Sequence, residues 1–199
     1  MEKTTPTRSR NAAATRAAIL ASARRAFARV GYDGAGVREI ARDAGVTAML
    51  VNRYFGSKEN LFAEVIANAM EDPVILAAEN LAAPDRAEHF ARALVGITTS
   101  GTTPLDGFLI MLYSASSERA AEIGREQIEK HHQRVMTGAL AGDLAPQRAA
   151  LVLSLVAGFQ VMRQMMGLPA LANADPDVLV RLLTPLFAEL IHGEGNASN

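Results

Sequence analysis

Apolar residues near the start of the chain recur at three- and four-residue steps, which is the spacing of one face of an α-helix. Arginines stand between these apolar positions. The pattern predicts a helix that begins near Asn11 and ends at Gly31, because a residue without a Cβ tolerates the left-handed conformation beyond a helix C-terminus. The apolar residues with this spacing are Ile19, Leu20, Ala23, Phe27 and Val30.

Two short helices joined by a tight turn are predicted next, over residues 37–44 and 48–55. Gly45 lies in the turn and can adopt the positive φ needed there, and Ala41 leaves room for the second helix to pack closely on the first. This arrangement is typical of a helix-turn-helix. Gly56 then ends the second helix, and Ser57 offers a hydroxyl N-cap to a further helix. The expected shared core contains Ile40, Val46 and Val51 with Ile19, Leu20, Phe27 and Phe62.

The chain beyond residue 72 continues to read as helix, and no period-2 strand pattern appears. Asp175-Pro176 gives an N-cap and a proline at the first position of the last helix, and Pro185 should kink that helix because it removes a backbone hydrogen bond. The fold class predicted is therefore all-α, with about nine helices. Those expected in this part cover residues 84–97, 105–112, 118–130, 147–167 and 177–191.

The net charge of -1 conceals an uneven distribution of charge. Residues 1–60 hold eleven Lys and Arg against five Asp and Glu, whereas the other 139 residues hold nine against sixteen. A basic end joined to an acidic remainder indicates that one end meets a polyanion. Arg24, Arg25 and Arg29 could either steer phosphate or form an ordinary solvated helix face.

Composition excludes several classes of protein. A hydrophobic fraction of 49% indicates a packed chain rather than a disordered one. Zero Cys excludes disulfides, thiolate zinc sites and a cysteine nucleophile. The longest charge-free stretch of the second half, 149–162, has 14 residues, whereas a membrane span needs roughly 20 apolar residues. No secretory signal pattern precedes the first helix, so we expect a cytoplasmic protein.

Three segments resemble the TetR-type transcriptional repressors in order and spacing: "ILASARRAFARVGYDG", "VREIARDAGVT" and "NRYFGSKENLF". The resemblance runs from about Thr15 to Phe62 and implies a three-helix DNA-binding domain, a homodimer on a palindromic operator and a helical effector-binding domain. The organisation that it implies is a flexible basic arm (1–10), a helix-turn-helix domain (11–56), an effector-binding and dimerisation domain (57–192) and a disordered tail (193–199). The function expected is ligand-responsive repression, although activation, the effector, the operator and the regulated genes stay open.

The resemblance also implies roles for individual residues. Thr47 matches the hydroxyl that caps the recognition helix, Tyr54 an aromatic residue near the DNA backbone, and Lys58 a lysine that faces a phosphate. Gly36 departs from the usual Ser or Thr, so any phosphate contact there must come from its backbone N–H. Asn52 departs from a common Tyr. The residues expected at the DNA are Gly36, Thr47, Ala48, Met49, Leu50, Asn52, Arg53, Tyr54 and Lys58.

Base recognition is open at two of these positions. Asn can pair with adenine and Arg with guanine, each worth roughly 1–3 kcal/mol of discrimination. Asn52 and Arg53 are therefore the candidates for sequence reading. Tyr54 and Phe55 could equally be core residues, and Lys58 taken by itself would be a surface lysine.

The last two long helices are the expected dimer interface. The helix over 147–167 is apolar almost all round, so it must be covered on most sides. The stretch "ALANADPDVLVRLLTPLF" is similar to the last helix of one common class of C-terminal domains in this family. Pairing of both helices with their twofold mates gives a four-helix interface, in which Ala157 and Gly158 permit close approach. Core packing inside one subunit is the alternative.

A mostly apolar effector pocket is expected between the C-terminal helices. Methionines suit such a pocket because they adapt to varied ligands, although each residue could also be ordinary core. Arg163 needs an anionic partner, a carbonyl or solvent, because it lies in an apolar helix. The candidates are Phe90, Phe108, Met111, Leu112, Tyr113, Met136, Phe159, Met162, Arg163 and Met166.

Two other functions compete with this interpretation. Glu129 with His132, and Glu189 with His192, have the i, i+3 spacing of di-iron carboxylate bundles. Single ligands from Glu118, Glu88 or Glu64 would complete that site. The second rival is an architectural DNA-binding protein without an effector. No phosphate loop, His-Glu-x-x-His or nucleophile elbow occurs, so we expect no enzyme, no metal and no cofactor.

Overall fold

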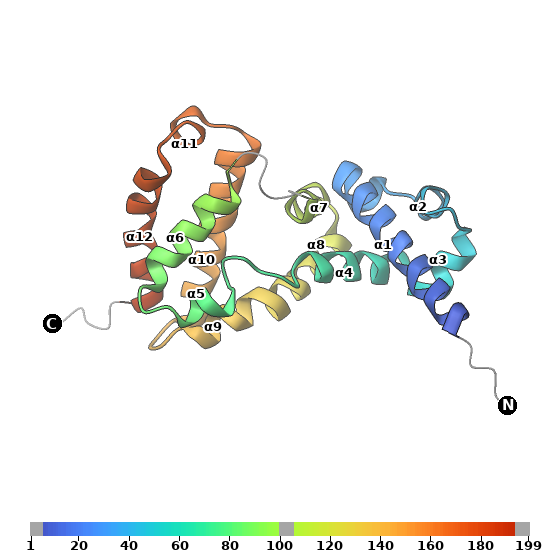
Figure 1. The fold of residues 1–199 in the computed structure, drawn as a ribbon, viewed down its shortest axis with the longest axis horizontal. Helices are drawn as coiled ribbons and strands as arrows, with labels where there is room; N and C mark the ends of the chain where they lie inside the picture. Colours follow the sequence, from blue (N-terminus) through green and yellow to red (C-terminus); the bar gives the residue numbers. More distant parts are fainter. Residues whose placement is uncertain (1–5, 100–105, 194–199) are drawn as a thin grey trace. The chain divides into compact units, whose positions relative to one another are not determined.

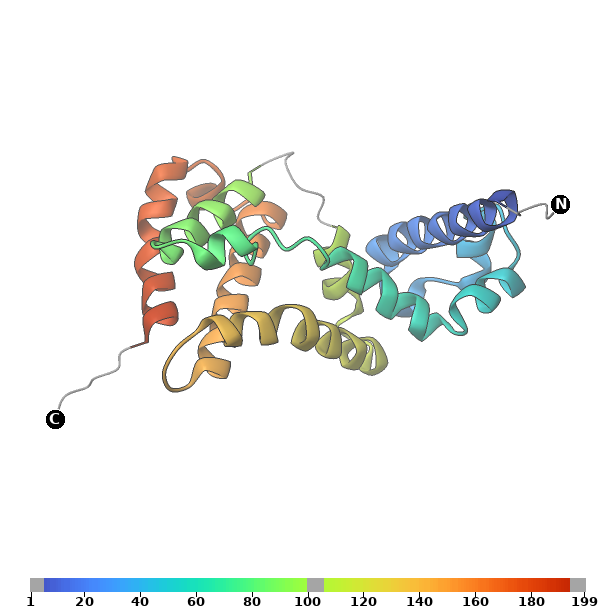
Figure 2. The ribbon, with the colours of Figure 1, turned by 60° about the horizontal axis from the view of Figure 1, so that its bottom comes forward.

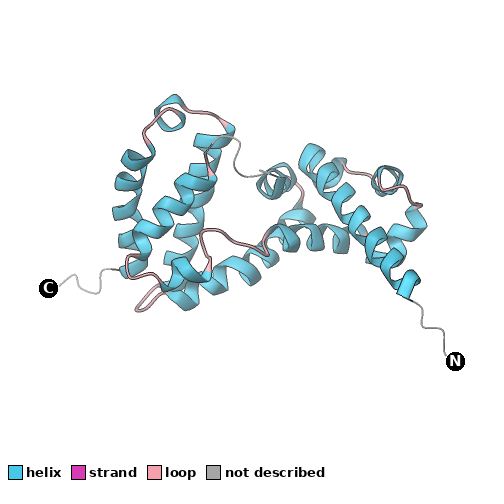
Figure 3. Cartoon of the chain, viewed as in Figure 1, coloured by secondary structure: helices cyan, strands magenta, loops and turns pink. Residues whose placement is uncertain are grey.

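The computed structural model describes residues 6–99 and 106–193. Within these two ranges the chain forms helices, turns and loops and contains no strand (Figure 3). The predicted all-α fold class is confirmed. The contacts divide the chain into two units, unit 1 with residues 1–71 and 105–127, and unit 2 with residues 72–104 and 128–199.

Unit 1 is built around one aromatic cluster. Phe27 and Phe62 meet edge to face with ring centroids 5.0 Å apart, and both side chains are buried. Ile19, Ile40 and Val51 are buried in the same core, as the periodicity predicted, whereas Leu20 and Val46 pack against its edge. The helices of unit 1 are α1 (Pro6–Gly34), α2 (Val37–Asp43), α3 (Ala48–Phe55), α4 (Lys58–Ala69), α7 (Asp106–Ser114) and α8 (Glu118–Ile128).

The first helix begins earlier than predicted and is interrupted at Gly31. It begins at Pro6, so residues 6–10, expected in a flexible arm, belong to α1, and residues 1–5 lie outside the described residues. At the other end Gly31 has non-helical backbone angles, φ 68° and ψ −175°, so the first helical stretch stops there as predicted and a short second stretch follows it to Gly34. A Cβ at Gly31 would overlap the backbone carbonyl of Tyr113. Glycine is therefore required because α7 packs directly against the α1 backbone at this point.

Unit 2 is a bundle in which α6, α10 and α12 are packed together (Figures 1 and 2). Phe90 from α6 and Phe187 from α12 meet edge to face at 5.9 Å in its core. Two short helices, α5 and α11, add to the nine expected. The helices are α5 (Ala78–Ala82), α6 (Arg86–Ile97), η1 (Glu129–Gln133), α9 (Arg134–Ala139), α10 (Ala145–Gln160), η2 (Val161–Met165), α11 (Pro169–Ala172) and α12 (Pro176–His192).

Two of the helices contain a π-helical turn, which is η1 between α8 and α9 and η2 at the end of α10. Helix continues without a loop on both sides of η1, and η2 follows directly after α10. Such single turns are frequent at functional sites. The start of α12 agrees with its expected caps, because the Asp175 side chain accepts hydrogen bonds from the backbone N–H groups of Asp177 and Val178.

Arginines in unit 2 stabilise the C-terminal ends of helices. Arg148 is buried and donates to the carbonyls of Ile191 at 3.2 Å and Asp143 at 3.0 Å, and also to that of Ala141. Arg86 donates to the carbonyl of Ala139, the last residue of α9, at 2.6 Å. Carbonyls at a helix C-terminus lack intrahelical donors and carry partial negative charge, so they suit a guanidinium.

The span Ala145–Met165, α10 with η2, is long and apolar enough to cross a membrane by length and composition alone. It contains two buried arginines, Arg148 and Arg163, and a single helix of this kind is weak evidence for a membrane span. Much of its surface is left uncovered within one chain, including Leu151 and Met162.

Candidate nucleic-acid interface and effector region

The helix-turn-helix is closed by backbone hydrogen bonds. Gly45 adopts φ 70° in the turn, and the Val46 N–H then donates to the Ala41 carbonyl at 2.9 Å. The Thr47 hydroxyl caps α3 by accepting from the Leu50 N–H at 3.3 Å. Gly36 is the N-cap of α2 and supplies no side-chain hydrogen bond. The N-cap residue of α2 therefore offers only its backbone to a phosphate.

The recognition helix α3 presents one continuous exposed face. Met49, Asn52 and Arg53 are exposed and lie at i, i+3 and i+4, so they share one side of the helix. The Met49 side chain is 81% exposed. Ala48, Leu50 and Tyr54 are half-buried at the margins of this face, whereas Val51 and Phe55 are buried on the opposite side. We call Met49, Asn52 and Arg53 the reading face.

Lys58 begins α4 directly after the Ser57 N-cap, whose hydroxyl accepts from the Asn60 N–H at 3.2 Å. Its Nζ lies 4.4 Å from the ring centroid of Tyr32. The Tyr32 hydroxyl donates to Glu59 Oε1 at 3.0 Å. Sequence reasoning did not single out Tyr32. The only signal for it was its place in the family-like stretch "ARVGYDG", which gives no partner.

Three of the α1 arginines are paired with carboxylates of unit 1. Arg16 pairs with Glu64, and Arg24 Nε lies 3.2 Å from Asp106 Oδ2. Arg29 pairs with Glu39. In the described part of the chain no such ion pair involves Arg25, Arg38 or Arg53. The positive charge free to meet a polyanion is thus smaller around α1 than the sequence count indicates.

The residues expected to bind an effector fall into both units. Those on α7, in unit 1, are half-buried at Phe108 and Met111 and exposed at Leu112 and Tyr113. Those in unit 2 divide further, since Met136, Phe159 and Arg163 are buried, whereas Met162 and Met166 are exposed. Each unit therefore brings together only part of the expected set.

Arg163 is held by carbonyls rather than by an acid. Its Nη1 donates to the Val95 carbonyl at 2.7 Å and to the Thr98 hydroxyl at 2.8 Å, and its Nε donates to the Leu171 carbonyl at 3.2 Å. The guanidinium also lies 5.8 Å from the Phe159 ring. Burial lowers the pKa of Arg163 from its ordinary value. The sequence left an anion, a carbonyl or solvent open as the partner of Arg163, and the structure supplies carbonyls.

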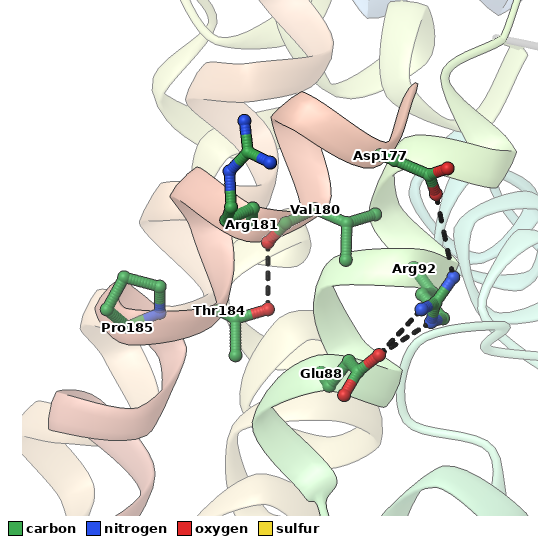
Figure 4. A pocket seen from close by; sticks show the side chains of 7 residues that line it. All are labelled: Glu88, Arg92, Asp177, Val180, Arg181, Thr184 and Pro185. Carbon is green, nitrogen blue, oxygen red and sulfur yellow. Dashed lines mark hydrogen bonds and ion pairs between the residues drawn. The ribbon is translucent and has the colours of Figure 1, made fainter. Parts of the chain in front are cut away.

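A groove between α6 and α12 contains none of the expected effector residues (Figure 4). Arg92 crosses it, with Nη2 2.6 Å from Glu88 Oε1 and Nη1 3.9 Å from Asp177 Oδ1. Figure 4 shows these ion pairs on one side of the groove and Arg181, Thr184 and Pro185 on the other. Five of its seven lining residues have charged or polar side chains, whereas sites for apolar ligands are lined predominantly by hydrophobic and aromatic side chains.

Among the described residues no group of three or more His, Asp or Glu side chains could hold a metal ion. Glu129 and His192 are exposed, and the Nε2 atoms of His131 and His132 are buried without a hydrogen-bond partner there. The arrangement needed by the di-iron alternative is thus not assembled within residues 6–99 and 106–193.

Comparison with known proteins agrees with this geometry. The family model of bacterial regulatory proteins of the tetR family matches residues 19–65, and that of the tetracyclin repressor-like C-terminal domain matches residues 87–191. The first match contains the helix-turn-helix, and the second contains most of the helices of unit 2. A comparison with curated proteins gave no match.

Solved structures of this family are similar to nearly the whole chain. A TetR-family regulator from Streptomyces coelicolor A3 is 26% identical, with 90% of this chain and 95% of that chain covered and a TM-score of 0.58. NalD, the secondary repressor of the MexAB-OprM multidrug efflux pump in Pseudomonas aeruginosa, is 21% identical over 92% and 97%, with a TM-score of 0.65.

The transcriptional regulator FadR from Bacillus subtilis, solved in complex with stearoyl-CoA, is 16% identical over 89% of this chain and 98% of its own, with a TM-score of 0.64. The two family matches together cover most of the sequence, in the order helix-turn-helix and then helical domain. This chain therefore belongs to the TetR family and is a DNA-binding transcriptional regulator, not an enzyme.

Proposed function

We propose that this regulator is a ligand-responsive repressor that binds a palindromic operator as a homodimer. The observation that carries the proposal is the reading face, where an apolar, an amide and a guanidinium side chain are exposed together on a capped helix. Amide and guanidinium groups recognise adenine and guanine edges in the major groove. Thr47, Gly36 and Lys58 would supply groups suited to phosphate, and Ala48, Leu50 and Tyr54 would complete the interface.

The proposed dimer forms through α10 and α12. Large apolar side chains remain exposed on both helices, at Leu151 and Met162 on the first and at Val178, Leu182 and Leu186 on the second. An exposed apolar surface on two adjacent helices indicates a protein interface. Ser154 and Gly158 lie exposed between Leu151 and Met162, and their small side chains would let the partner's helices approach closely.

The proposed effector is a predominantly apolar molecule bound among the helices of residues 57–192. NalD represses an efflux pump and FadR was solved with stearoyl-CoA, and the present chain shares their fold. Without effector, the two recognition helices would lie about 34–36 Å apart, one turn of B-DNA. An effector that binds the wider-spaced form better would shift the population away from the operator. We place this regulator in the cytoplasm, where it has access to DNA.

Selection of duplexes from a random pool tests the proposal. We expect enrichment of a palindrome with two similar half-sites, and the double variant N52A/R53A should lose that sequence preference while keeping its fold. Arg181→Ala, an exposed arginine of unit 2, is the matched control and should enrich the same sequence. Absence of any enriched sequence with the unmodified protein would overturn the proposal.

A second measurement separates a regulator with an effector from an architectural protein. A bound ligand raises the melting temperature by mass action, so a thermal-shift screen of acyl-CoA thioesters, fatty acids and hydrophobic cations should yield stabilising compounds. The same compounds should release the enriched palindrome. Stabilisation by none of these classes would contradict the ligand-responsive part of the proposal.

A further inference from the structure

Tyr32 contacts two oppositely charged side chains at the start of α4, Lys58 and Glu59. Its ring is only 6% exposed and packs edge to face against Phe62, with centroids 4.9 Å apart. Its backbone N–H donates to the Ser114 hydroxyl at 2.9 Å. Both the ring and the backbone of Tyr32 are therefore fixed within unit 1.

The face of the fixed ring is occupied by an ammonium group. Lys58 Nζ lies 4.4 Å from the ring centroid, within the range of a cation–π interaction. A lysine has a flexible four-carbon stem, and its ammonium is otherwise free to sample many positions in water. Contact with Tyr32 restricts Lys58 to the N-terminal side of α4, where backbone N–H groups also attract anions.

The hydroxyl of the same ring restrains the neighbouring acid. Tyr32 donates to Glu59 Oε1 at 3.0 Å. Hydrogen bonds from the Glu59 backbone N–H, from Ser57 and from Tyr32 keep the pKa of Glu59 below its usual range. Burial and the Glu59 carboxylate raise the pKa of Tyr32 to about 12. At neutral pH the pair is thus a phenol donating to a carboxylate.

We propose that Tyr32 is a positioning residue of the DNA interface, holding the Lys58 ammonium toward a phosphate with its ring and keeping the Glu59 carboxylate away from that phosphate with its hydroxyl. The inference rests on the proposed contact of Lys58 with DNA. Without the restraint, a mobile carboxylate next to Lys58 would repel the phosphate and pair with the ammonium in its place. The two ends of the tyrosine therefore make separable contributions.

Fluorescence anisotropy with the enriched palindrome, measured over a series of KCl concentrations, tests both contributions. Tyr32→Phe keeps the ring but frees Glu59 to compete for the Lys58 ammonium, so we expect about 3-fold weaker binding and a less steep slope of log affinity against log salt. In a Glu59→Gln background, Tyr32→Phe should have no further effect, because the charge to be restrained is gone. An equal loss in both backgrounds would overturn the role of the hydroxyl.

Tyr32→Leu removes the ring and tests the role of the cation–π contact. In a Glu59→Gln background, where the hydroxyl has no charge to restrain, we expect Tyr32→Leu to weaken binding by about 5-fold, with little additional effect of this change once Lys58 is also replaced by Ala. Circular dichroism must show that the variant is folded. If it is not, the Lys58 side-chain proton signals of the unmodified protein in nuclear magnetic resonance provide the second measurement, because protons held over the ring face should be shifted upfield from those of an exposed lysine such as Lys130.

Undiminished affinity in folded Tyr32→Leu, or Lys58 side-chain signals at the positions of an exposed lysine in the unmodified protein, would overturn the inference. Failure of the unmodified protein to bind any duplex would instead contradict the proposed function. The unmodified protein and the Tyr32 variants thus report on separate claims.

Discussion

Arg163 Nη1 donates to the Val95 carbonyl oxygen at 2.7 Å, which joins the π-helical turn η2 to the last full turn of α6. The Thr98 hydroxyl accepts from the same nitrogen and itself donates to the Leu94 carbonyl at 2.7 Å. The α6 C-terminus supplies partial negative charge. A guanidinium that is only 7% exposed is thereby accommodated without a paired carboxylate.

Replacement of Arg163 by Met should lower the free energy of unfolding by about 2–4 kcal/mol, because buried carbonyls lose their donor. Arg163→Lys should fall between Met and the wild type, since one ammonium cannot reproduce the planar fork. Urea unfolding followed by circular dichroism measures both. Arg181→Met is the control and should change stability by less than about 0.5 kcal/mol, because Arg181 is exposed. Equal stability of Arg163→Met and wild type would contradict this explanation.

Gly31→Ala should destabilise unit 1 by more than about 2 kcal/mol, because the added methyl group meets the Tyr113 carbonyl at a backbone position with positive φ. Gly138→Ala makes the same chemical change inside α9, where a Cβ meets nothing within 4 Å. That control should be neutral or stabilising by about 0.5–1 kcal/mol. Thermal unfolding compares the two, and similar melting temperatures would show that α7 does not pack as described.

The exposed Met49 should recognise a thymine. Apolar side chains contact the C5-methyl group of thymine in the major groove, and Met49 is the large apolar group on the reading face. Replacement of each thymine of the operator by deoxyuridine removes only that methyl group. One such replacement should weaken binding by about 3- to 10-fold for the wild type and leave binding of Met49→Ala unaffected. Equal sensitivity of both proteins would exclude this contact.

Leu182→Asp should convert the proposed dimer to a monomer. Leu182 is 62% exposed in one chain, and a carboxylate there would be desolvated in the proposed interface. Analytical ultracentrifugation should show a lower sedimentation coefficient. Operator affinity should also fall, because a monomer contacts one half-site whereas a dimer contacts two at once. Val135→Asp, an exposed apolar position on α9, should remain dimeric. A dimeric Leu182→Asp protein would place the interface elsewhere.

Acidification should lower the free energy of unfolding, because His132 is harder to protonate in the folded chain than in the unfolded chain. Burial, with a smaller effect of His131, lowers the pKa of His132 below its ordinary value of 6.5. The unfolded chain therefore binds a proton at a higher pH than the folded chain, and stability present above pH 6.5 is lost as the pH falls below it. His132→Gln should show a smaller loss between pH 7.5 and about 5.5 in urea titrations. His89→Gln, at an exposed position, should behave as the wild type.

The helix-turn-helix was predictable because each of its features is local. Gly45 and Thr47 act through their own turn and cap. The residues expected at the DNA included Met49, Asn52 and Arg53, which are exposed, but also Ala48, Leu50 and Tyr54, which are half-buried. The short helices α5 and α11 were missed because four or five residues are too few to show a helical period. The π-helical turns likewise leave no compositional signal.

Features that depend on distant residues were not predictable. Gly31 carried a correct signal for positive φ, but the sequence could not show that helix resumes after it or that α7 packs there. The partners of Arg163 are 68 and 8 positions away in the sequence. The expected effector residues were chosen by residue type, and type does not reveal that Met136 is core while Met166 is exposed.

The three atoms nearest to a Cβ placed on Gly31 are main-chain atoms of residues 113 and 114. The tyrosine side chain at 113 is half exposed, so this part of the attachment of α7 to α1 does not depend on its identity. The side chain at position 113 can therefore be exchanged without a change in the close approach of the α7 main chain to Gly31. A saturation library should accordingly accept many amino acids at 113 and almost none but glycine at 31.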